Sequence, residues 1–106
     1  MGREEIKERM GYVLQGRYLS KAGVSYNVDG EIVIRVDLHG MSKNIAQKTL
    51  NNLIVLFRFP FIIQVVHGYN NGIAIKSMIS RELNNSKIVE KRSLPENPGV
   101  TYLKIA

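Results

Sequence analysis

The sequence predicts an α/β fold, a two-layer sandwich, and three observations support this prediction. Residues 32–40 alternate as a half-buried β-strand does, with only apolar side chains on one side and Val33, Arg35, Asp37 and His39 on the other. Residues 61–66, FIIQVV, are almost continuously apolar, which is typical of a central strand in a partly parallel sheet. Residues 42–57, which separate these two strands, carry apolar side chains at helical spacing.

Residues 1–31 form an N-terminal extension in this prediction, ahead of a main domain at residues 32–106. Residues 4–15 carry an apolar stripe and predict a short helix, which Gly16 can close. Residues 17–23 are mixed in composition and are typical of a linker. Residues 24–28 predict a short strand, and Asp29-Gly30 is a tight-turn signal that joins this strand to the next in a hairpin.

In the main domain, Gly40 ends the first strand and Ser42 offers an N-cap to the helix at 42–57. After the strand at 61–66, residues 73–84 predict a second helix and residues 87–91 a short strand. Residues 92–99 contain two prolines and predict a loop, and residues 100–105 alternate again as a last strand. We therefore expect a β-α-β-α-β-β core with a mixed four-stranded sheet. Right-handed crossovers would place both helices on one face of that sheet.

Composition narrows the classes of protein to consider. The 106-residue length corresponds to one domain, and the absence of cysteine excludes disulfides, thiolate zinc sites and cysteine nucleophiles. No segment approaches the roughly 18 apolar residues of a membrane span. The N-terminal segment MGREEIKERM is charged and has no apolar signal core. We expect a cytoplasmic protein with no membrane partner.

The net charge of +6 is unevenly distributed along the chain. Residues 1–31 contain five basic and five acidic side chains, whereas residues 32–106 contain ten basic and four acidic ones. The whole excess therefore lies in the main domain. A basic domain indicates a polyanionic partner, most often DNA or RNA, although the same charge can serve solubility alone.

The polar side of the strand at 32–40 carries Arg35, Asp37 and His39 in one row. A strand places Asp37 and His39 roughly 6–7 Å apart along the chain, where the carboxylate can orient the imidazole as a general base or hold a Mg²⁺ or Mn²⁺ ion. His67 ends the second strand in the same His-Gly pair and reaches the same edge if the two strands are neighbours. These groups could activate water for phosphodiester hydrolysis. In the alternative interpretation, Asp37 caps a turn and both histidines satisfy buried backbone groups.

The segment 68–72 lies between a strand and a helix, so free N–H groups and the positive end of the helix dipole could bind phosphate there. Tyr69 could stack on an unpaired base, and cations could contact the phosphate backbone. The alternative is an ordinary strand-to-helix connection. The candidate nucleic-acid-binding residues are Gly68, Tyr69, Asn70, Gly72, Lys76, Arg35 and Lys43.

Three short motifs resemble the small MutS-related (Smr) domain family. They are VDLHGMS at residues 36–42, VVHGYNNG at residues 65–72, and PGVT at residues 98–101. The resemblance covers residues 32–106. Asn70 replaces the middle glycine of the family's His-Gly-x-Gly-x-Gly loop, and Lys76 stands where the family usually has arginine.

The resemblance implies a two-layer α/β sandwich similar to the C-terminal domain of bacterial translation initiation factor three. It implies nucleic-acid binding and, as in several members, nicking or single-strand-selective endonuclease activity. The expected protein is a weak DNA or RNA nicking endonuclease for branched or single-stranded substrates, with Asp37, His39 and His67 as catalytic residues. The alternative is a module that binds RNA or branched DNA without performing chemistry.

Overall fold

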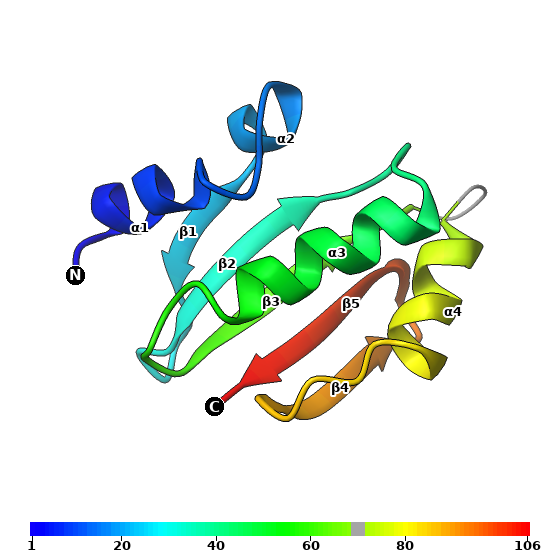
Figure 1. Ribbon diagram of the computed structural model, residues 1–106. Helices are drawn as coiled ribbons and strands as arrows, with labels where there is room; N and C mark the ends of the chain where they lie inside the picture. The colour runs from blue at the N-terminus through cyan, green and yellow to red at the C-terminus, as the bar shows by residue number, and fades with distance from the viewer. Residues whose placement is uncertain (69–71) are drawn as a thin grey trace.

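The computed structural model describes residues 1–68 and 72–106 and has a mixed α/β fold (Figure 1). The helices of this part of the chain are α1 (Arg3–Met10), α2 (Arg17–Ser20), α3 (Lys43–Ile54) and α4 (Ile73–Arg81). The strands are β1 (Gly23–Tyr26), β2 (Ile32–Asp37), β3 (Phe61–Val66), β4 (Ile88–Leu94) and β5 (Asn97–Ile105).

The strands form one open sheet in the order β1-β2-β3-β5-β4. Strands β2 and β3 are parallel, and the other neighbouring pairs are antiparallel. The sheet is therefore mixed, as expected, but it has five strands where the sequence predicts four in the main domain. The additional strand is β1, which the Asp29-Gly30 turn returns onto β2. In that turn, the Asn27 side chain accepts hydrogen bonds from the backbone N–H groups of Asp29 and Glu31.

Helices α3 and α4 lie on the same face of the sheet (Figure 1). The apolar side of β2 points toward them, and Ile34, Val36 and Leu38 are fully buried. Helix α3 begins as predicted, because the Ser42 hydroxyl accepts a hydrogen bond from the N–H of Ile45. The side chain of Ile45, expected on the buried side, is 54% exposed. It lies about 100° around the helix from Ala46, at the margin of the buried stripe.

The N-terminal extension contributes to the same core as the main domain. Ile6, Met10 and Leu14 are buried in one cluster with the apolar residues of α3 and the sheet. The expected helix at 4–15 is shorter than predicted, since α1 ends at Met10 and Gly11 forms its C-cap. Glycine is a poor helix former, and the chain continues in turns that still bury Leu14.

Two other segments expected to be irregular have regular structure. Residues 17–23, predicted as a linker, contain the helical turn α2 and the first residue of β1. Residues 92–99, predicted as a loop, are a tight hairpin in which β4 runs to Leu94 and β5 begins at Asn97. Pro95 lies in the turn and Pro98 lies near the start of β5. Proline has no backbone N–H, and it is tolerated at such positions because no N–H is needed there for pairing in the sheet.

Two lysines from the β4 region bind the C-terminal ends of the helices. The Lys87 Nζ donates to the carbonyl of Phe57 at 2.8 Å, just beyond α3. The Lys91 Nζ donates to the carbonyls of Ile79 and Leu83 at 2.7 Å each, at the end of α4. A cation is favourable at a helix C-terminus, where carbonyl groups lack helical partners. These lysines therefore connect the helical layer to the edge of the sheet.

In the described ranges 1–68 and 72–106, no helix has both the length and the apolar character needed to cross a membrane.

We expect Lys91→Met to lower the free energy of unfolding by about 1–2 kcal/mol, because two helix-terminal carbonyls lose a charged donor. Chemical denaturation followed by circular dichroism measures this change. Lys48→Met, at an exposed position of α3, is the matched control and should change stability by less than about 0.5 kcal/mol. Equal stability of the two variants would show that the Lys91 contacts do not stabilise the fold.

Candidate functional site

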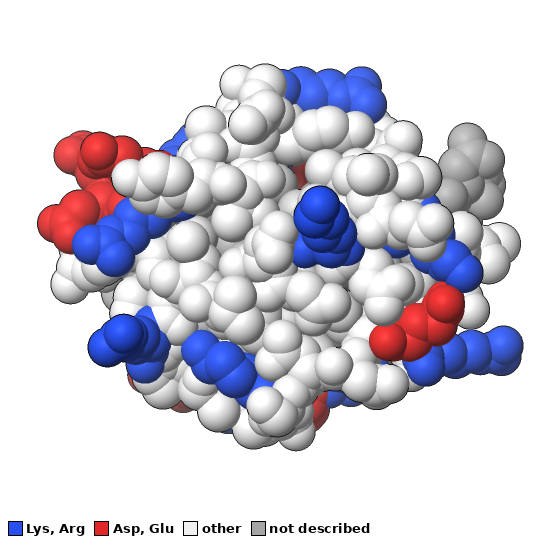
Figure 2. Space-filling view, viewed as in Figure 1, with Lys and Arg blue, Asp and Glu red and all other residues white. Residues whose placement is uncertain are grey.

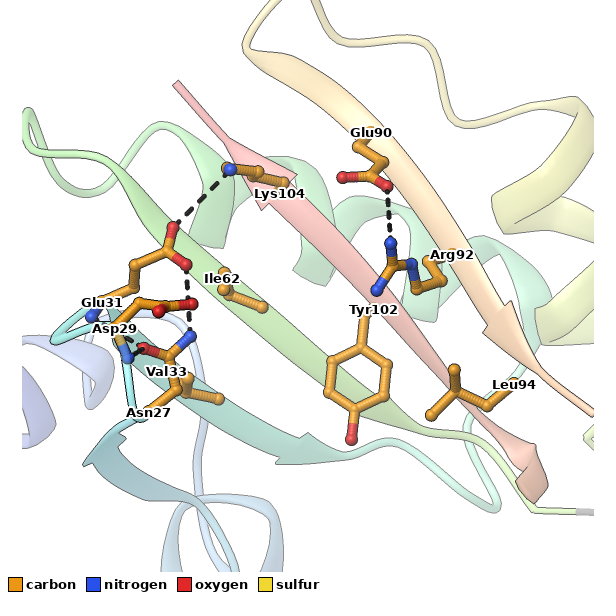
Figure 3. A pocket seen from close by; sticks show the side chains of 10 residues that line it. All are labelled: Asn27, Asp29, Glu31, Val33, Ile62, Glu90, Arg92, Leu94, Tyr102 and Lys104. Atoms are coloured by element: carbon orange, nitrogen blue, oxygen red, sulfur yellow. Dashed lines mark hydrogen bonds and ion pairs between the residues drawn. The ribbon is translucent and has the colours of Figure 1, made fainter. Parts of the chain in front are cut away.

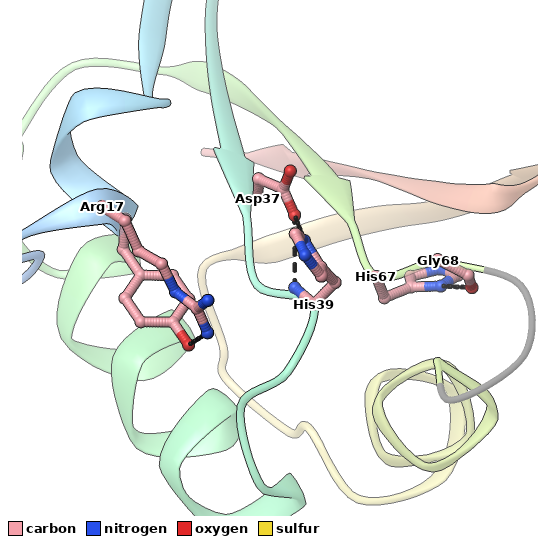
Figure 4. Close-up of polar contacts among 6 residues, drawn as sticks. Arg17, Asp37, His39, His67 and Gly68 are labelled. Carbon is pink, nitrogen blue, oxygen red and sulfur yellow. Dashed lines mark hydrogen bonds and ion pairs between the residues drawn. The ribbon is translucent and has the colours of Figure 1, made fainter.

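Asp37 and His39 are in direct contact at the exposed end of β2 (Figure 4). The Nδ1 atom of His39 lies 2.5 Å from Oδ1 of Asp37, and the backbone N–H of His39 donates to the same oxygen at 3.2 Å. The His39 side chain is 51% exposed, whereas that of Asp37 is 14% exposed. Gly40 follows with a φ of +88°, a conformation that favours glycine. The sequence-predicted pair is therefore brought together, with the imidazole on the solvent side.

This contact defines the chemical character of the pair. Burial acts to raise the pKa of the Asp37 carboxyl, but hydrogen bonds from the His39 ring and backbone, together with the charges of His39 and Lys21, hold that pKa below its ordinary value. When the carboxylate accepts a hydrogen bond from Nδ1–H, Nε2 is the basic nitrogen of a neutral imidazole. The pair can therefore act as an oriented general base.

The N-terminal extension places two cations near this pair. The Nη2 atom of Arg17 lies 3.1 Å from the position that a Cβ on Gly40 would occupy, and its guanidinium stands over the Tyr18 ring at 4.9 Å from the ring centroid. Lys21 comes just before β1, and its charge lowers the pKa of Asp37. Both side chains are exposed. The end of β2 therefore combines a carboxylate–imidazole pair with two positive charges.

The sequence prediction did not include Arg17 or Lys21. The position of Lys21 could have been predicted from the hairpin. The antiparallel β1–β2 register pairs Gly23 with Arg35, so two residues further along the pair Lys21 comes opposite Asp37. Counting back from the Asp29-Gly30 turn could have found that position. For Arg17 the sequence has no comparable signal, because its position depends on how α2 packs at the end of the sheet.

His67, predicted to act with Asp37 and His39, occupies a different environment. Its side chain is 1% exposed, on the helix-covered side of β3. Its Nε2 lies 2.8 Å from the hydroxyl of Thr101, and its Nδ1 lies 3.1 Å from the carbonyl of Gly68. Burial lowers the pKa of His67; the Gly68 carbonyl opposes this effect and the charge of Lys76 adds to it. The structure thus gives His67 the contacts of a structural histidine and does not hydrogen-bond it to the Asp37–His39 pair.

Gly68 joins the two strand ends. A Cβ at Gly68 would lie 3.9 Å from the Cβ of His39, so the ends of β2 and β3 are adjacent, as the parallel pairing requires. Gly68 has a φ of +85°, and its N–H and that of His67 both donate to the carbonyl of Gly99. With the bond from His67 to Thr101, these contacts connect all three motifs noted in the sequence.

Gly72, at the start of α4, makes the closest backbone approach of any glycine in the described part of the chain. A Cβ there would lie 2.2 Å from the carbonyl oxygens of both His67 and Gly68. The glycine is therefore required by close packing, since its φ of −87° is an ordinary value. Two of the other predicted phosphate contacts, Tyr69 and Asn70, lie outside the described residues.

The remaining predicted cations are dispersed. Arg35 is exposed, and it points away from the helix side because its neighbours Ile34 and Val36 are buried there. Lys43 forms an exposed ion pair with Glu82 at 3.2 Å. Lys76 lines a hollow of about 160 Å³ together with Lys91 and Thr101, among others. On the face seen in Figure 2, blue side chains stand apart from one another and do not gather into one basic patch.

The protein supplies few donor atoms for a divalent cation at this site. Mg²⁺ usually keeps several waters and binds through one or two carboxylates together with substrate phosphates. Asp37 is the single carboxylate of the pair, and one of its oxygens is occupied by His39. In residues 1–68 and 72–106, no group of three or more histidine, cysteine, aspartate or glutamate side chains is arranged to hold a metal. Asp37 could therefore hold a Mg²⁺ or Mn²⁺ ion only with water and substrate phosphate as the other ligands, and this role stays a prediction.

Comparison with known proteins finds no protein-family model and no curated protein sequence that matches this chain.

We expect the stability of the fold to decrease as the pH falls below about 6.5, the ordinary pKa of histidine, because of His67. Its pKa is lower in the folded state than its ordinary value, so folding favours the neutral ring. The stabilisation is complete above the unfolded pKa and is lost as the pH falls toward the folded pKa, at most about 1.4 kcal/mol per pH unit. The corresponding effect of Asp37 occurs below about pH 4, a separate window, because its ordinary pKa is 3.8.

Denaturant unfolding at a series of pH values tests this expectation. His67→Gln should flatten the profile in that window, since glutamine can hydrogen-bond Thr101 but does not titrate. The chain has only two histidines, so His39→Gln is the matched control and should keep the slope. A slope that disappears with His39→Gln and persists with His67→Gln would contradict the assignment.

We expect Gly72→Ala to destabilise the protein by about 1–3 kcal/mol, because the new methyl group would overlap two backbone carbonyls and force the start of α4 away from β3. Thermal unfolding of the variant measures the loss. Gly23→Ala is the control, since a Cβ at Gly23 meets no atom within 4 Å. Unchanged stability of Gly72→Ala would mean that α4 can shift at little cost.

Proposed function

We propose that the protein is a nucleic-acid-binding endonuclease that nicks DNA or RNA, with branched or single-stranded nucleic acid as substrate. The observation that supports this function is the exposed Asp37–His39 contact at the end of β2, with Arg17 and Lys21 on the same edge. The resemblance of the three motifs to the Smr family and the net charge of +6 support the same class of substrate.

In this mechanism Asp37 orients the reacting base. Its Oδ1 accepts hydrogen bonds from both the ring Nδ1 and the backbone N–H of His39, so the ring cannot rotate without losing a contact. Nε2 of His39 takes a proton from a water molecule as the water oxygen attacks the phosphorus atom. The bond from phosphorus to one ester oxygen breaks, and that oxygen takes a proton from solvent.

The cations stabilise the charge that develops during this reaction. The attacked phosphorus carries additional negative charge on its non-bridging oxygens, and positive groups placed there lower the barrier. Arg17 is well suited to this role, because a guanidinium can donate two parallel hydrogen bonds to phosphate. Its stacking on Tyr18 restricts its orientation before substrate arrives.

His67 acts in this proposal as a positioning residue. Its ring is buried, so it does not meet the substrate directly, but its backbone N–H and its Nε2 join β3 to Gly99 and Thr101. These bonds hold Gly68 beside His39.

A module that binds nucleic acid without cleaving it is the second candidate. The observation that favours it is that residues 1–68 and 72–106 contain no cluster of three or more histidine, cysteine, aspartate or glutamate side chains at the Asp37–His39 pair or elsewhere. Binding of this kind would rest on phosphate contacts and would weaken steeply with salt.

We expect His39→Ala and Asp37→Asn each to reduce cleavage by about 10²–10⁴-fold while nucleic-acid binding is retained, because each removes the oriented base and leaves the cations in place. The assay uses labelled single-stranded, duplex and branched DNA and structured RNA, with and without Mg²⁺ or Mn²⁺. Glu8→Gln, at an exposed carboxylate of α1 away from the pair, is the matched control and should cleave normally.

Cleavage that persists in both variants would show that this pair is not the catalytic base. Substrate that is bound by the unaltered protein but remains intact under every condition would leave the binding module as the function. Melting curves of all variants confirm that they are folded.

A further inference from the structure

The face of the sheet opposite α3 and α4 carries a row of side chains that the proposed reaction does not use. Strand register places Arg35, Gln64, Tyr102 and Arg92 directly opposite one another across β2, β3, β5 and β4. Tyr102 points away from the core, because its neighbours Thr101 and Leu103 are buried on the helix side. We call these four residues the cross-strand row.

A hollow of about 380 Å³ lies against this row (Figure 3). Its apolar walls are formed by Tyr102 and three aliphatic side chains, namely Val33, Ile62 and Leu94. Its remaining lining is polar and consists of Asn27, Asp29, Glu31, Glu90, Arg92 and Lys104. The hollow is therefore an aromatic and aliphatic recess with hydrogen-bonding groups around it, which is the usual character of a small-ligand site.

The charges around the hollow exclude some ligands. Lys104 pairs with Glu31 at 3.7 Å and Arg92 pairs with Glu90 at 3.5 Å, so both cations are balanced there, and Asp29 adds one further negative charge. A phosphate or an acidic side chain is therefore unfavourable inside the recess. A flat, uncharged group with hydrogen-bonding edges suits it, because it can contact the apolar walls and reach the polar groups.

The electrostatic character changes toward the Asp37–His39 pair. Arg35 is exposed and lies outside the hollow. It is two residues before Asp37, so both side chains are on the same side of β2. The register then places Asp37 opposite Val66, roughly 6–7 Å further along the strands. Lys21 and Arg17 lie at that end of the sheet. The surface thus leads from a neutral recess, past one cation, to a positively charged catalytic edge.

We propose that the hollow binds one unpaired base of the nucleic-acid substrate, stacked on Tyr102, while the adjoining phosphates pass Arg35 toward Asp37 and His39. This inference rests on the proposed function and specifies its substrate as single-stranded at the contact. A base in a duplex has both its faces covered by neighbouring bases, so it cannot stack on a side chain, whereas an unpaired base can.

Fluorescence anisotropy with three labelled probes tests this inference. The probes are a 12-nucleotide single strand, the same strand with abasic sites that keep every phosphate, and the corresponding duplex. The unaltered protein should bind the ordinary strand about tenfold more tightly than the abasic strand, within the range known for stacking of one base on an aromatic side chain.

Variants at Tyr102 separate base stacking from phosphate binding. Tyr102→Ala should weaken binding of the ordinary strand about tenfold and leave the abasic strand unaffected, whereas Tyr102→Phe should bind both as the unaltered protein does. Tyr26→Ala is the matched control, because Tyr26 is a 52% exposed tyrosine of the same sheet outside the hollow, and it should have no effect. Arg35→Gln should weaken binding of the ordinary and abasic strands alike and reduce the salt dependence.

The outcomes distinguish failure of this inference from failure of the proposed function. Single-strand binding that Tyr102→Ala does not weaken, or equal affinity for ordinary and abasic strands, would overturn the inference and leave the nuclease proposal in place. Affinity that depends on Tyr102 without any cleavage would support the inference and refute the nuclease. If no probe binds, both fail. If Tyr102→Ala does not fold, Tyr102→Leu preserves the apolar bulk and provides the same comparison.

Discussion

The parallel pairing of β2 with β3 is the constraint on which the rest of the structure depends. Two parallel strands cannot be joined by a tight turn, so α3 must cross over the sheet between them. Their C-terminal ends then lie at the same edge, which brings His39 and Gly68 together. Each strand is followed by a His-Gly pair, and both glycines adopt a positive φ that lets the chain leave the sheet sharply.

The two histidines lie in opposite environments because successive residues of a strand point to opposite faces. His39 lies beyond the last residue of β2 and remains exposed, where Asp37 orients it. His67 follows β3 on the core side, where a polar ring must find partners for both nitrogens. The Thr101 hydroxyl and the Gly68 carbonyl supply them. The buried His67 ring therefore connects the β4–β5 hairpin to the edge of the sheet where His39 is exposed.

The N-terminal extension is integral to both the core and the site. It adds β1 to the sheet, buries Ile6 and Met10 in the same core as α3 and the sheet, and places Lys21 and Arg17 at the end of β2. Without these cations, the Asp37–His39 pair would have a base but little positive charge to attract a phosphate. The proposed division of labour therefore uses three parts of the fold: the strand edge for chemistry, the extension for charge, and the open face of the sheet for an unpaired base.

The local features were readable in the sequence because they depend on near neighbours. Alternation along residues 32–38 identified which side of β2 is buried, Ser42 was identified as an N-cap, and Asp29-Gly30 was identified as a hairpin turn. The sequence placed Asp37 and His39 on one side of a strand; their direct contact forms in the turn after β2, where Asp37 Oδ1 also accepts the backbone N–H of His39. In each case the contact is decided by backbone geometry over a few residues.

Only the tertiary structure decided the contacts between distant segments. Strand alternation placed Thr101 on one side of its strand, but only the register of β5 against β3 brings it to His67. The position of Arg17 beside Gly40 depends on the packing of α2, and the hollow at Tyr102 requires four strands to be placed side by side. Periodicity in a sequence specifies the face on which a residue lies; its partner across the sheet is selected by the packing of the whole core, which no local pattern records.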